Sequence, residues 1–357
     1  MADDSATRPT SLIGLAPEEI ARLPALAGES PFHARQIAAW IYRRGARDFA
    51  SMTNLSKHLR DRLARDHSLE RLPTLAAEVS ADGSARKSLF LLPGGGRVEA
   101  VLIRAPRRDT LCVSTQAGCA HGCRFCATGA MGLARNLTVH EILSQVLTLR
   151  DDLVGLGLRG FFNLVFMGMG EPLDNYAAVV AAIRVMHDDF GLALGHRRIT
   201  ISTVGLPHQM RRLAGESLPV RLALSLNATE NHTRSALMPV NRRYPIEEVL
   251  PALRDYRQRT GSRVTLEYIL IEGVNDSIED ARRLAGMARD CDAKINLIRL
   301  NAHALTSLTP ASPERVQAFY EALLPIAPAV TVRDSRGADI RAACGQLSTA
   351  YETGAAS

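Results

Sequence analysis

The chain has 357 residues, 46% hydrophobic and only 5% aromatic, so it can bury a large and mainly aliphatic core. Its net charge of +6 is compatible with a nucleic-acid partner, although many basic proteins bind none. No apolar run approaches the roughly 18 residues of a membrane helix, and the first residues are polar and acidic. We therefore expect neither a membrane span nor a signal peptide, and a cytoplasmic location.

Residues 1–73 are predicted to form a small helical module. The periodicity of its apolar residues predicts three helices: one beginning near Pro17, one over residues 31–46, and one over residues 53–66 capped by Thr53 or Asn54. Trp40 is expected in the core of this module rather than on its surface as a platform for base stacking.

Positive charge is concentrated in residues 31–65. Eight Lys or Arg residues there stand against two Asp residues, a balance of +6 that equals the excess of the whole chain. Such a stretch is either a solvated helix face or a binding surface for a phosphate backbone, and charge alone does not distinguish the two. The basic residues are Arg35, Arg43, Arg44, Arg47, Lys57, Arg60, Arg62 and Arg65.

From residue 74 onward the pattern is that of strands, and later of alternating strands and helices. Residues 74–109 are predicted to form a small antiparallel β extension, with strands at 75–80, 86–92 and 98–104. Residues 110–334 are predicted to form an α/β domain, a partial (β/α)6 barrel with a parallel sheet, and residues 335–357 an irregular tail. The barrel strands are expected at 111–116, 161–167, 199–203, 220–226, 263–270 and 294–299, with helices near 138–151, 175–189, 206–214, 246–259, 277–290 and 312–325.

Three cysteines, Cys119, Cys123 and Cys126, lie within eight residues, with Phe125 directly before the third. Three thiolates on one short loop can hold three irons of a [4Fe–4S] cluster and leave the fourth iron open to a small molecule. The alternatives are three incidental thiols or a zinc site completed by His121, but structural zinc usually takes paired knuckles, and no second knuckle lies nearby. The spacing resembles the signature of the radical S-adenosylmethionine (SAM) superfamily.

Further polar residues fall where predicted barrel strands end. The active site of a parallel barrel lies at the carboxyl ends of its strands. The Gly-rich turn 168–172 follows the second strand, and its Glu171 is suited to the ammonium group of SAM. Ser202, the stretch 225–227 and Asn301 end the third, fourth and sixth strands. So many polar groups at one end of successive strands are difficult to explain by packing.

Over about residues 10–350 the chain resembles the RlmN-type dual-specificity adenine C2 RNA methyltransferases, a radical SAM family. The cysteine loop alone indicates only the superfamily. The turn Gly168–Pro172 (GMGEP) and the segment Ala343–Leu347 (ACGQL) indicate the family. Other matching segments are Pro31–Gln36, Trp40–Tyr42, Met52–Leu55, Leu111–Gln116, Met131–Gly132, Arg135–Thr138, Ser225–Asn227 and Met238–Arg242.

The resemblance implies a role for each matching residue. It makes Cys119, Cys123 and Cys126 the ligands of one [4Fe–4S] cluster. It makes Cys344 the cysteine that carries the methyl group, Cys112 the second active-site cysteine and Glu99 the active-site base. Cys291 matches no functional position, and Asn301 lacks the nearby proline that we expect. The implied SAM-binding residues are Gly170, Glu171, Ser202, Ser225, Leu226, Asn227 and Asn301.

The implied reaction methylates C2 of adenine 2503 in 23S rRNA and of adenine 37 in tRNA, with two SAM molecules per turnover. One SAM methylates Cys344, and the other is cleaved at the cluster to a radical that removes hydrogen from this methyl group. The methylene radical adds to the ring, Glu99 helps to remove the ring proton, and Cys112 releases the product as a disulfide forms. The implied partners are the RNA substrates, held by the basic module, and an electron donor such as flavodoxin with its reductase. A monomer is expected.

Three other functions remain open from the sequence. The related enzymes that methylate C8 of the same adenine share the cysteines, so motifs alone do not determine the ring carbon. A non-catalytic RNA-binding protein with a structural iron–sulfur cluster would need neither an open iron nor a tail cysteine. A glycyl-radical activase would use SAM and a cluster but would need neither Cys344 nor Cys112.

Overall fold

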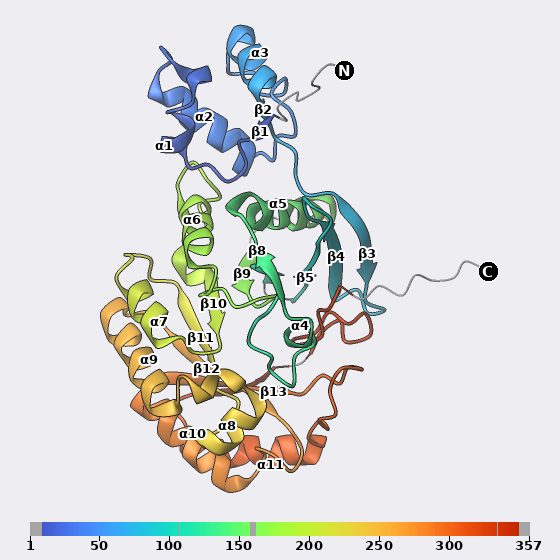
Figure 1. The fold of residues 1–357 in the computed structure, drawn as a ribbon, viewed down its shortest axis with the longest axis vertical. Helices are drawn as coiled ribbons and strands as arrows, with labels where there is room; N and C mark the ends of the chain where they lie inside the picture. Colours follow the sequence, from blue (N-terminus) through green and yellow to red (C-terminus); the bar gives the residue numbers. More distant parts are fainter. Residues whose placement is uncertain (1–8, 107, 158–161, 334, 350–357) are drawn as a thin grey trace, which may run out of the picture. The chain divides into compact units, whose positions relative to one another are not determined.

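In a computed structural model of the chain, the structure describes residues 9–106, 108–157, 162–333 and 335–349. The chain divides into two compact units, and Figure 1 shows the elements of each. The first unit combines residues 1–73 with 138–160 and 177–195. The second combines residues 74–137, 161–176 and 196–357, and it holds the predicted β extension, all the predicted barrel strands and the tail.

The first unit contains the predicted helical module. Its helices are α1 (Pro17–Ile20), α2 (Pro31–Tyr42) and α3 (Lys57–Asp66), with a 3-10 turn at Pro24–Leu26 and a pair of short parallel strands, β1 (Thr10–Ser11) and β2 (His67–Ser68). The same unit includes α5 (Val139–Gly155) and most of α6 (Tyr176–His187).

Two details of this module differ from the prediction. The third helix is capped by Ser56, whose hydroxyl accepts from the backbone N–H of Leu59 at 3.1 Å, and not by Thr53 or Asn54. Trp40 is half-buried rather than part of the core. Its indole N–H bonds the Asn54 side chain, and the Arg44 guanidinium lies 4.2 Å from the ring centroid, so polar partners keep this ring at the surface.

Helix α5 is joined to the helical module by ion pairs and a hydrogen bond to the backbone. Asp151 accepts hydrogen bonds from Arg71 at 2.8 Å and from Arg47 at 2.9 Å. Arg150 donates to the backbone carbonyl of Tyr42, at the end of α2. Arg71 is buried, and this burial lowers the pKa of its guanidinium to about 10 although the Asp151 carboxylate opposes the shift. These contacts join helices that are far apart in the sequence into one unit.

The second unit is built on a ten-stranded sheet in the order β14-β13-β12-β11-β10-β9-β6-β5-β4-β3. From β6 to β14 all neighbours are parallel, and from β3 to β6 they are antiparallel, so the predicted β extension continues the barrel sheet. The strands are β3 (Thr74–Val79), β4 (Ala85–Leu91), β5 (Arg97–Ile103), β6 (Asp109–Cys112), β9 (Phe162–Phe166), β10 (Ile199–Thr203), β11 (Arg221–Ser225), β12 (Val264–Leu270), β13 (Ala293–Arg299) and β14 (Val330–Arg333).

Amphipathic helices follow the parallel strands, as the alternating pattern predicts. Figure 1 shows them along the outside of the β10–β14 sheet. The buried strand faces are aliphatic, as the low aromatic content suggests. The described helices lack the length and apolar character needed to cross a bilayer. The helices of this unit are α4 (Ala127–Ala130), α7 (Pro207–Ala214), α8 (Asn231–Leu237), α9 (Ile246–Thr260), α10 (Ile278–Asp290) and α11 (Pro313–Leu323).

The first barrel strand differs most from the prediction. The strand expected over 111–116 ends at Cys112, and the chain then forms a separate antiparallel hairpin of β7 (Gln116–Gly118) and β8 (Leu133–Asn136). The cysteine loop therefore lies inside this hairpin rather than directly after a barrel strand. A seventh parallel strand, β14, pairs with β13 at the edge of the sheet and was not predicted.

Candidate active site

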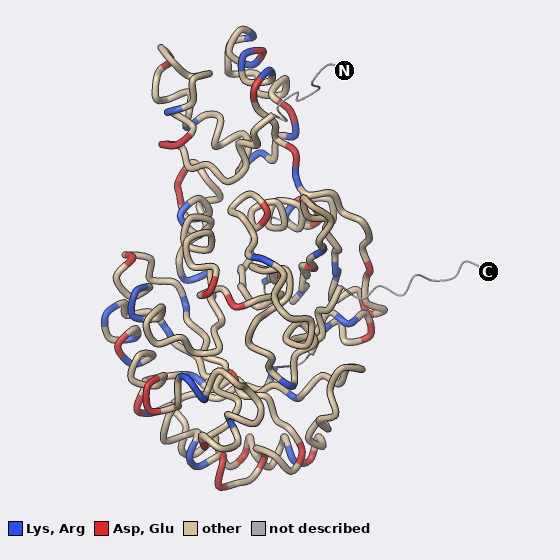
Figure 2. The backbone as a smooth tube through the Cα atoms, viewed as in Figure 1, with Lys and Arg blue, Asp and Glu red and all other residues tan. Residues whose placement is uncertain are grey.

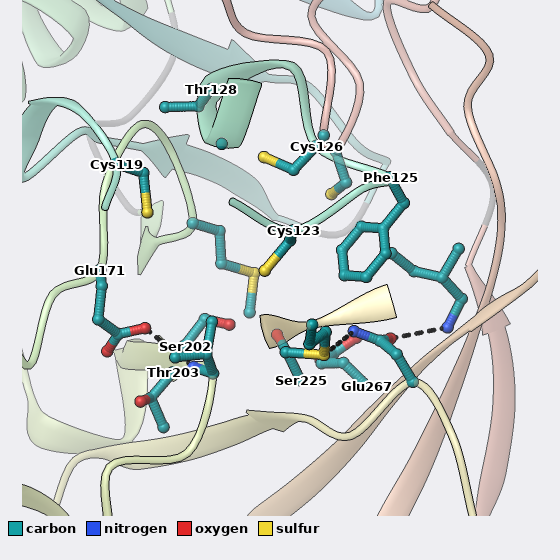
Figure 3. Close-up of a pocket in the computed structure, with 18 of the residues that line it drawn as sticks. Cys119, Cys123, Phe125, Cys126, Thr128, Glu171, Ser202, Thr203, Ser225 and Glu267 are labelled. Atoms are coloured by element: carbon teal, nitrogen blue, oxygen red, sulfur yellow. Dashed lines mark hydrogen bonds between the residues drawn. The ribbon is translucent and has the colours of Figure 1, made fainter. Parts of the chain in front are cut away.

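The three cysteines of the motif lie on one loop, between β7 and α4. The thiols of Cys119, Cys123 and Cys126 are free and line one cavity. Figure 3 shows the three side chains pointing into this space, with Glu171 and Ser202 facing them from the strand ends. The three predicted cluster ligands therefore lie around one cavity.

The thiols suit an iron–sulfur cluster better than a single ion. Burial raises the pKa of Cys119 to about 12 and raises the pKa values of Cys123 and Cys126 as well, so each thiol keeps its proton until a metal replaces it. Nowhere in the described ranges do three His, Cys, Asp or Glu side chains gather closely enough to hold one metal ion. Separate thiols around one cavity fit a cluster, in which each thiolate holds its own iron.

Five of the seven predicted SAM-binding residues line the same cavity from the carboxyl ends of three strands. Gly170 has a φ of +98°, and a Cβ at this position would lie 2.5 Å from the Cβ of Gln116. Only glycine therefore lets the turn after β9 pack against β7. The five residues are Gly170, Glu171, Ser202, Ser225 and Asn227.

Glu171 is a buried acid with an unusual pKa. Its carboxylate oxygens accept hydrogen bonds from the backbone N–H groups of Leu173 at 3.1 Å and Val204 at 2.9 Å. Burial nevertheless dominates and raises the pKa of Glu171 to about 7. A carboxylate held in this way offers a negative charge to a cationic ligand near neutral pH.

The other two predicted SAM-binding residues do not line the cavity. Leu226 is fully buried just beyond β11, so only its backbone can serve the site. Asn301 lies beyond β13, where its side-chain amide donates to the carbonyl of Cys344 at 3.0 Å. Asn301 therefore contacts the tail and is not placed against the SAM-binding strand ends.

A buried arginine that the sequence did not reveal connects two of these strand ends. Arg234 in α8 is 0% exposed and donates to the carbonyls of Leu226 at 3.0 Å, Val204 at 2.6 Å and Ser225 at 3.3 Å. It thereby fixes the backbone after β10 relative to that after β11. In the sequence, a single Arg in a short polar helix looks like a surface residue. Its partners here are backbone carbonyls, and because every residue has one, no residue type marks them in the sequence.

The tail brings Cys344 to the cavity. The carbonyls of the flanking residues Gly345 and Leu347 accept hydrogen bonds from the N–H of Ala127 at 2.7 Å and the hydroxyl of Thr128 at 2.5 Å. Both donors belong to α4, directly after the cysteine loop. The structure therefore places Cys344 beside the predicted cluster ligands, although more than 200 residues separate them.

Cys112 lies at the end of β6, behind the cavity rather than in its lining. Burial, followed by the nearby charge of Cys344, raises the pKa of Cys112 to about 12. Arg333 of β14 lines the cavity, and the charges of Cys344, Glu267 and Cys112 raise its pKa although burial opposes them. The charge of this unpredicted guanidinium opposes the rise in the pKa of Cys112. All six cysteines are free thiols, so the expected Cys112–Cys344 disulfide is not present in the structure.

Glu99 in β5 is also buried away from the cavity lining, with a side chain that is 1% exposed. One carboxylate oxygen lies 3.3 Å from the ammonium nitrogen of Lys87. The other accepts hydrogen bonds from the backbone N–H groups of Ser348 at 3.0 Å and Thr349 at 3.3 Å. The predicted base is therefore held against the tail that carries Cys344.

Comparisons with known proteins find family models and relatives that match this chain. Residues 113–285 match the radical SAM superfamily, and residues 10–69 match the ribosomal RNA large subunit methyltransferase N-terminal domain. The probable dual-specificity RNA methyltransferase RlmN of Moorella thermoacetica is 47% identical over 94% of this chain and 96% of its own length. The dual-specificity RNA methyltransferase RlmN of Geobacter sulfurreducens is 46% identical over 94% of this chain and 91% of its own length.

A solved structure has the same fold. A radical SAM methyltransferase from Sphaerobacter thermophilus superposes with a TM-score of 0.90 and 45% sequence identity, over 95% of this chain and 99% of that protein. The expected class of fold, a mixed α/β radical SAM fold, is therefore confirmed.

Proposed function

The chain belongs to the RlmN family of dual-specificity RNA methyltransferases, within the radical SAM superfamily, and we propose that it methylates C2 of adenine 2503 in 23S rRNA and of adenine 37 in tRNA. The observation that carries this proposal is the placement of Cys344. A cysteine from the tail shares one cavity with three loop cysteines and the polar strand ends. Neither a structural cluster nor a glycyl-radical activase needs such a cysteine.

We assign the cluster to Cys119, Cys123 and Cys126. A bound [4Fe–4S] cluster with one open iron supplies the electron that cleaves SAM to a radical. The protein contributes the loop that carries the three thiols, with Cys123 buried and Cys119 and Cys126 half-buried, and the tail bonds to α4 directly after this loop. Glu171 is assigned to the ammonium group of SAM, and the polar groups of Ser202, Ser225 and Asn227 to the rest of the molecule.

Cys344 is assigned as the acceptor of the first methyl group, and Cys112 as the thiol that later attacks the Cys344 sulfur. Arg333 is near enough to both sulfurs to stabilise the thiolate that each step requires. Glu99 is assigned as the acceptor of the ring proton, and its contact with the tail keeps it close to the residue that bears the RNA. Two SAM molecules are then consumed per turnover, one for each role.

The partners follow from this chemistry. We assign RNA binding to the exposed Lys and Arg residues of the segment 31–65. Figure 2 marks the positions of Lys and Arg along the backbone in blue. The target adenine must leave its stack to reach the cavity. Reduction of the cluster requires a one-electron donor, such as flavodoxin with its reductase. We propose that the protein acts as a monomer in the cytoplasm, where thiols stay reduced.

One experiment separates the candidate functions. The reconstituted protein is incubated anaerobically with SAM, a reductant and RNA, and the nucleosides are then analysed by mass spectrometry and chromatography. We expect 2-methyladenosine together with 5′-deoxyadenosine. The 8-methyl isomer would identify the C8 enzymes, and the absence of 5′-deoxyadenosine would identify a non-catalytic cluster protein.

A further inference from the structure

Three charged side chains form a ladder across β3, β4 and β5. Glu78 lies directly opposite Lys87 in the β3–β4 pairing, and Lys87 is two residues from Leu89, which pairs with Glu99. Alternate residues of a strand share one face, so Lys87 and Glu99 are diagonal neighbours on the same face of the sheet. The ammonium nitrogen of Lys87 lies 3.2 Å from a carboxylate oxygen of Glu78 and 3.3 Å from one of Glu99.

The inner half of this ladder is removed from water. The side chain of Lys87 is 3% exposed and that of Glu99 is 1% exposed, whereas Glu78 is 40% exposed. A buried carboxylate strongly favours its neutral form unless an opposite charge lies beside it. The fold therefore places a buried cation against the residue that the proposed function needs as an ionised base.

We propose that Lys87 is a positioning residue for the methyl transfer, one that holds one carboxylate oxygen of Glu99 and thereby turns the second oxygen toward the tail. This inference rests on the proposed function, because it takes Glu99 to be the base. Lys87 contacts one carboxylate oxygen, and the other meets the N–H groups of Ser348 and Thr349. The lysine thus holds one oxygen, and the other oxygen faces the tail that carries Cys344.

The contacts of Glu99 come from β4, the tail and the turn after β9. From β4 it meets Lys87 and, through Lys87, Glu78 of β3; from the tail it meets backbone N–H groups; and its own N–H contacts the sulfur of Met169. The ammonium group of Lys87 lies 3.3 Å from the carboxylate, and a charge-assisted contact of this kind fixes the orientation of the carboxylate.

The test uses the full-length reconstituted protein and the variants Lys87→Gln, Lys87→Arg, Glu99→Gln and Lys87→Gln/Glu99→Gln. Methylated Cys344, the covalent protein–RNA species on a denaturing gel and methylated RNA are measured for each protein. With Lys87→Gln we expect normal methylation of Cys344, product formation that is about tenfold slower, and accumulated protein–RNA species. Lys87→Arg should restore most of the rate, because it keeps a cation beside the Glu99 carboxylate.

Two controls separate positioning from a structural role. The double variant should be no slower than Glu99→Gln, within about twofold, because a residue that acts through Glu99 has no effect once Glu99 is gone. Glu78→Gln, which leaves Lys87 against Glu99, should stay within about twofold of the unmodified protein. A further loss in the double variant, or a Lys87→Gln defect that Lys87→Arg does not rescue, would overturn the proposal.

The outcome also separates this inference from the proposed function. If Glu99→Gln turns over like the unmodified protein, the assignment of the base fails and the role of Lys87 fails with it. If Glu99→Gln is impaired while Lys87→Gln is not, only the role of Lys87 is overturned.

Discussion

At the scale of single residues, the charge of the Glu171 side chain should control the binding of SAM near neutral pH. Because burial raises its pKa to about 7, about one-tenth of the molecules carry the negative charge at pH 6 and about nine-tenths at pH 8. Attraction to the ammonium group of SAM should follow this fraction. We therefore expect the affinity for SAM to increase about ninefold from pH 6 to pH 8, measured by equilibrium dialysis on the reconstituted protein.

The control for this prediction is Glu171→Gln, which keeps the shape of the side chain but cannot ionise. Its affinity should be low and nearly independent of pH. His121 also titrates nearby and hydrogen-bonds Asp174 at 2.7 Å, so a pH dependence that survives in Glu171→Gln would assign the effect to His121 or another group.

The two outlying cysteines should respond differently to substitution. Without Cys344 there is no methyl carrier, so neither methylated protein nor a protein–RNA species should form. Cys112→Ala should still be methylated and should trap the RNA, because no neighbouring thiolate can attack the Cys344 sulfur. Denaturing gels of each variant, with and without ribonuclease, measure this difference. The two-cysteine mechanism is wrong if the Cys112→Ala protein carries no RNA, or if the Cys344→Ala protein still methylates RNA.

Single residues also show how far the sequence could predict the site. The spacing of Cys119, Cys123 and Cys126 predicts a shared loop because neighbours in sequence are neighbours in space. The meeting of this loop with Cys344 followed only from the resemblance to a family, since nothing in the spacing predicts a contact across the chain. Arg333 and Lys87 were missed for a similar reason: each is an ordinary basic residue in a strand until the sheet register shows which acids or thiols it faces.

Among the elements, the tail has the most specific geometry. Gly345 has a φ of +82°, and a Cβ there would lie 3.0 Å from the carbonyl oxygen of Phe125 in the cysteine loop. Gly345→Val should therefore push the tail away from α4 and reduce methylated Cys344 several-fold. Iron and sulfide content should stay unchanged, because the cluster ligands belong to the loop itself. Peptide mass spectrometry measures the methylated Cys344, and iron and sulfide analysis measures the cluster content.

Gly273→Val is the matched control for the tail. Gly273 has a similar φ of +67°, but nothing lies within 4 Å of a Cβ at this position. The left-handed conformation costs about 1–2 kcal/mol in both variants. Only Gly345→Val adds a clash with the cysteine loop. Equal methylation of Cys344 in the two variants would mean that the tail does not depend on this close approach.

Long periodic elements were predicted well, and short ones were not. The helices α9 and α10 and the strands β12 and β13 agree with the prediction to within about two residues, because each presents several apolar residues at one spacing. The hairpin of β7 and β8, the helix α8 and the edge strand β14 were missed. Strands of three or four residues and a helix of seven contain too few repeats of their own period to be recognised, and tertiary contacts decide their conformation.

On the scale of the whole molecule, sequence order and compact units differ. The helical module predicted as residues 1–73 forms one unit with α5 and most of α6. The alternating pattern of strands and helices had assigned both of these helices to the barrel. The pattern could not show this, because an amphipathic helix reveals that it has a buried face but not which element covers it. The pairing of Arg71 and Arg47 with Asp151 is the physical link, and it spans 80 residues or more of sequence.

The same contacts show which cations of this unit can meet RNA. Arg47 is paired with Asp151 and Arg62 with Glu29 at 2.8 Å, while Arg60 donates to the carbonyl of Ala50. These three stabilise the unit itself, so reversing their charge would confuse folding with binding. Arg43, Lys57 and Arg65 are exposed and suit a test of the surface charge.

Reversing the charge of Arg43, Lys57 and Arg65 together to Glu should weaken RNA binding and flatten its dependence on salt. Each phosphate contact contributes about 0.7 to 0.9 to the slope of log affinity against log salt, so three lost contacts lower the slope by about two to three. Cluster content should not change, since these residues belong to the other unit. The matched control reverses Arg211, Arg254 and Arg282, three exposed cations on α7, α9 and α10. An equal loss of slope in both triple variants would show that net charge, and not this surface, governs RNA binding.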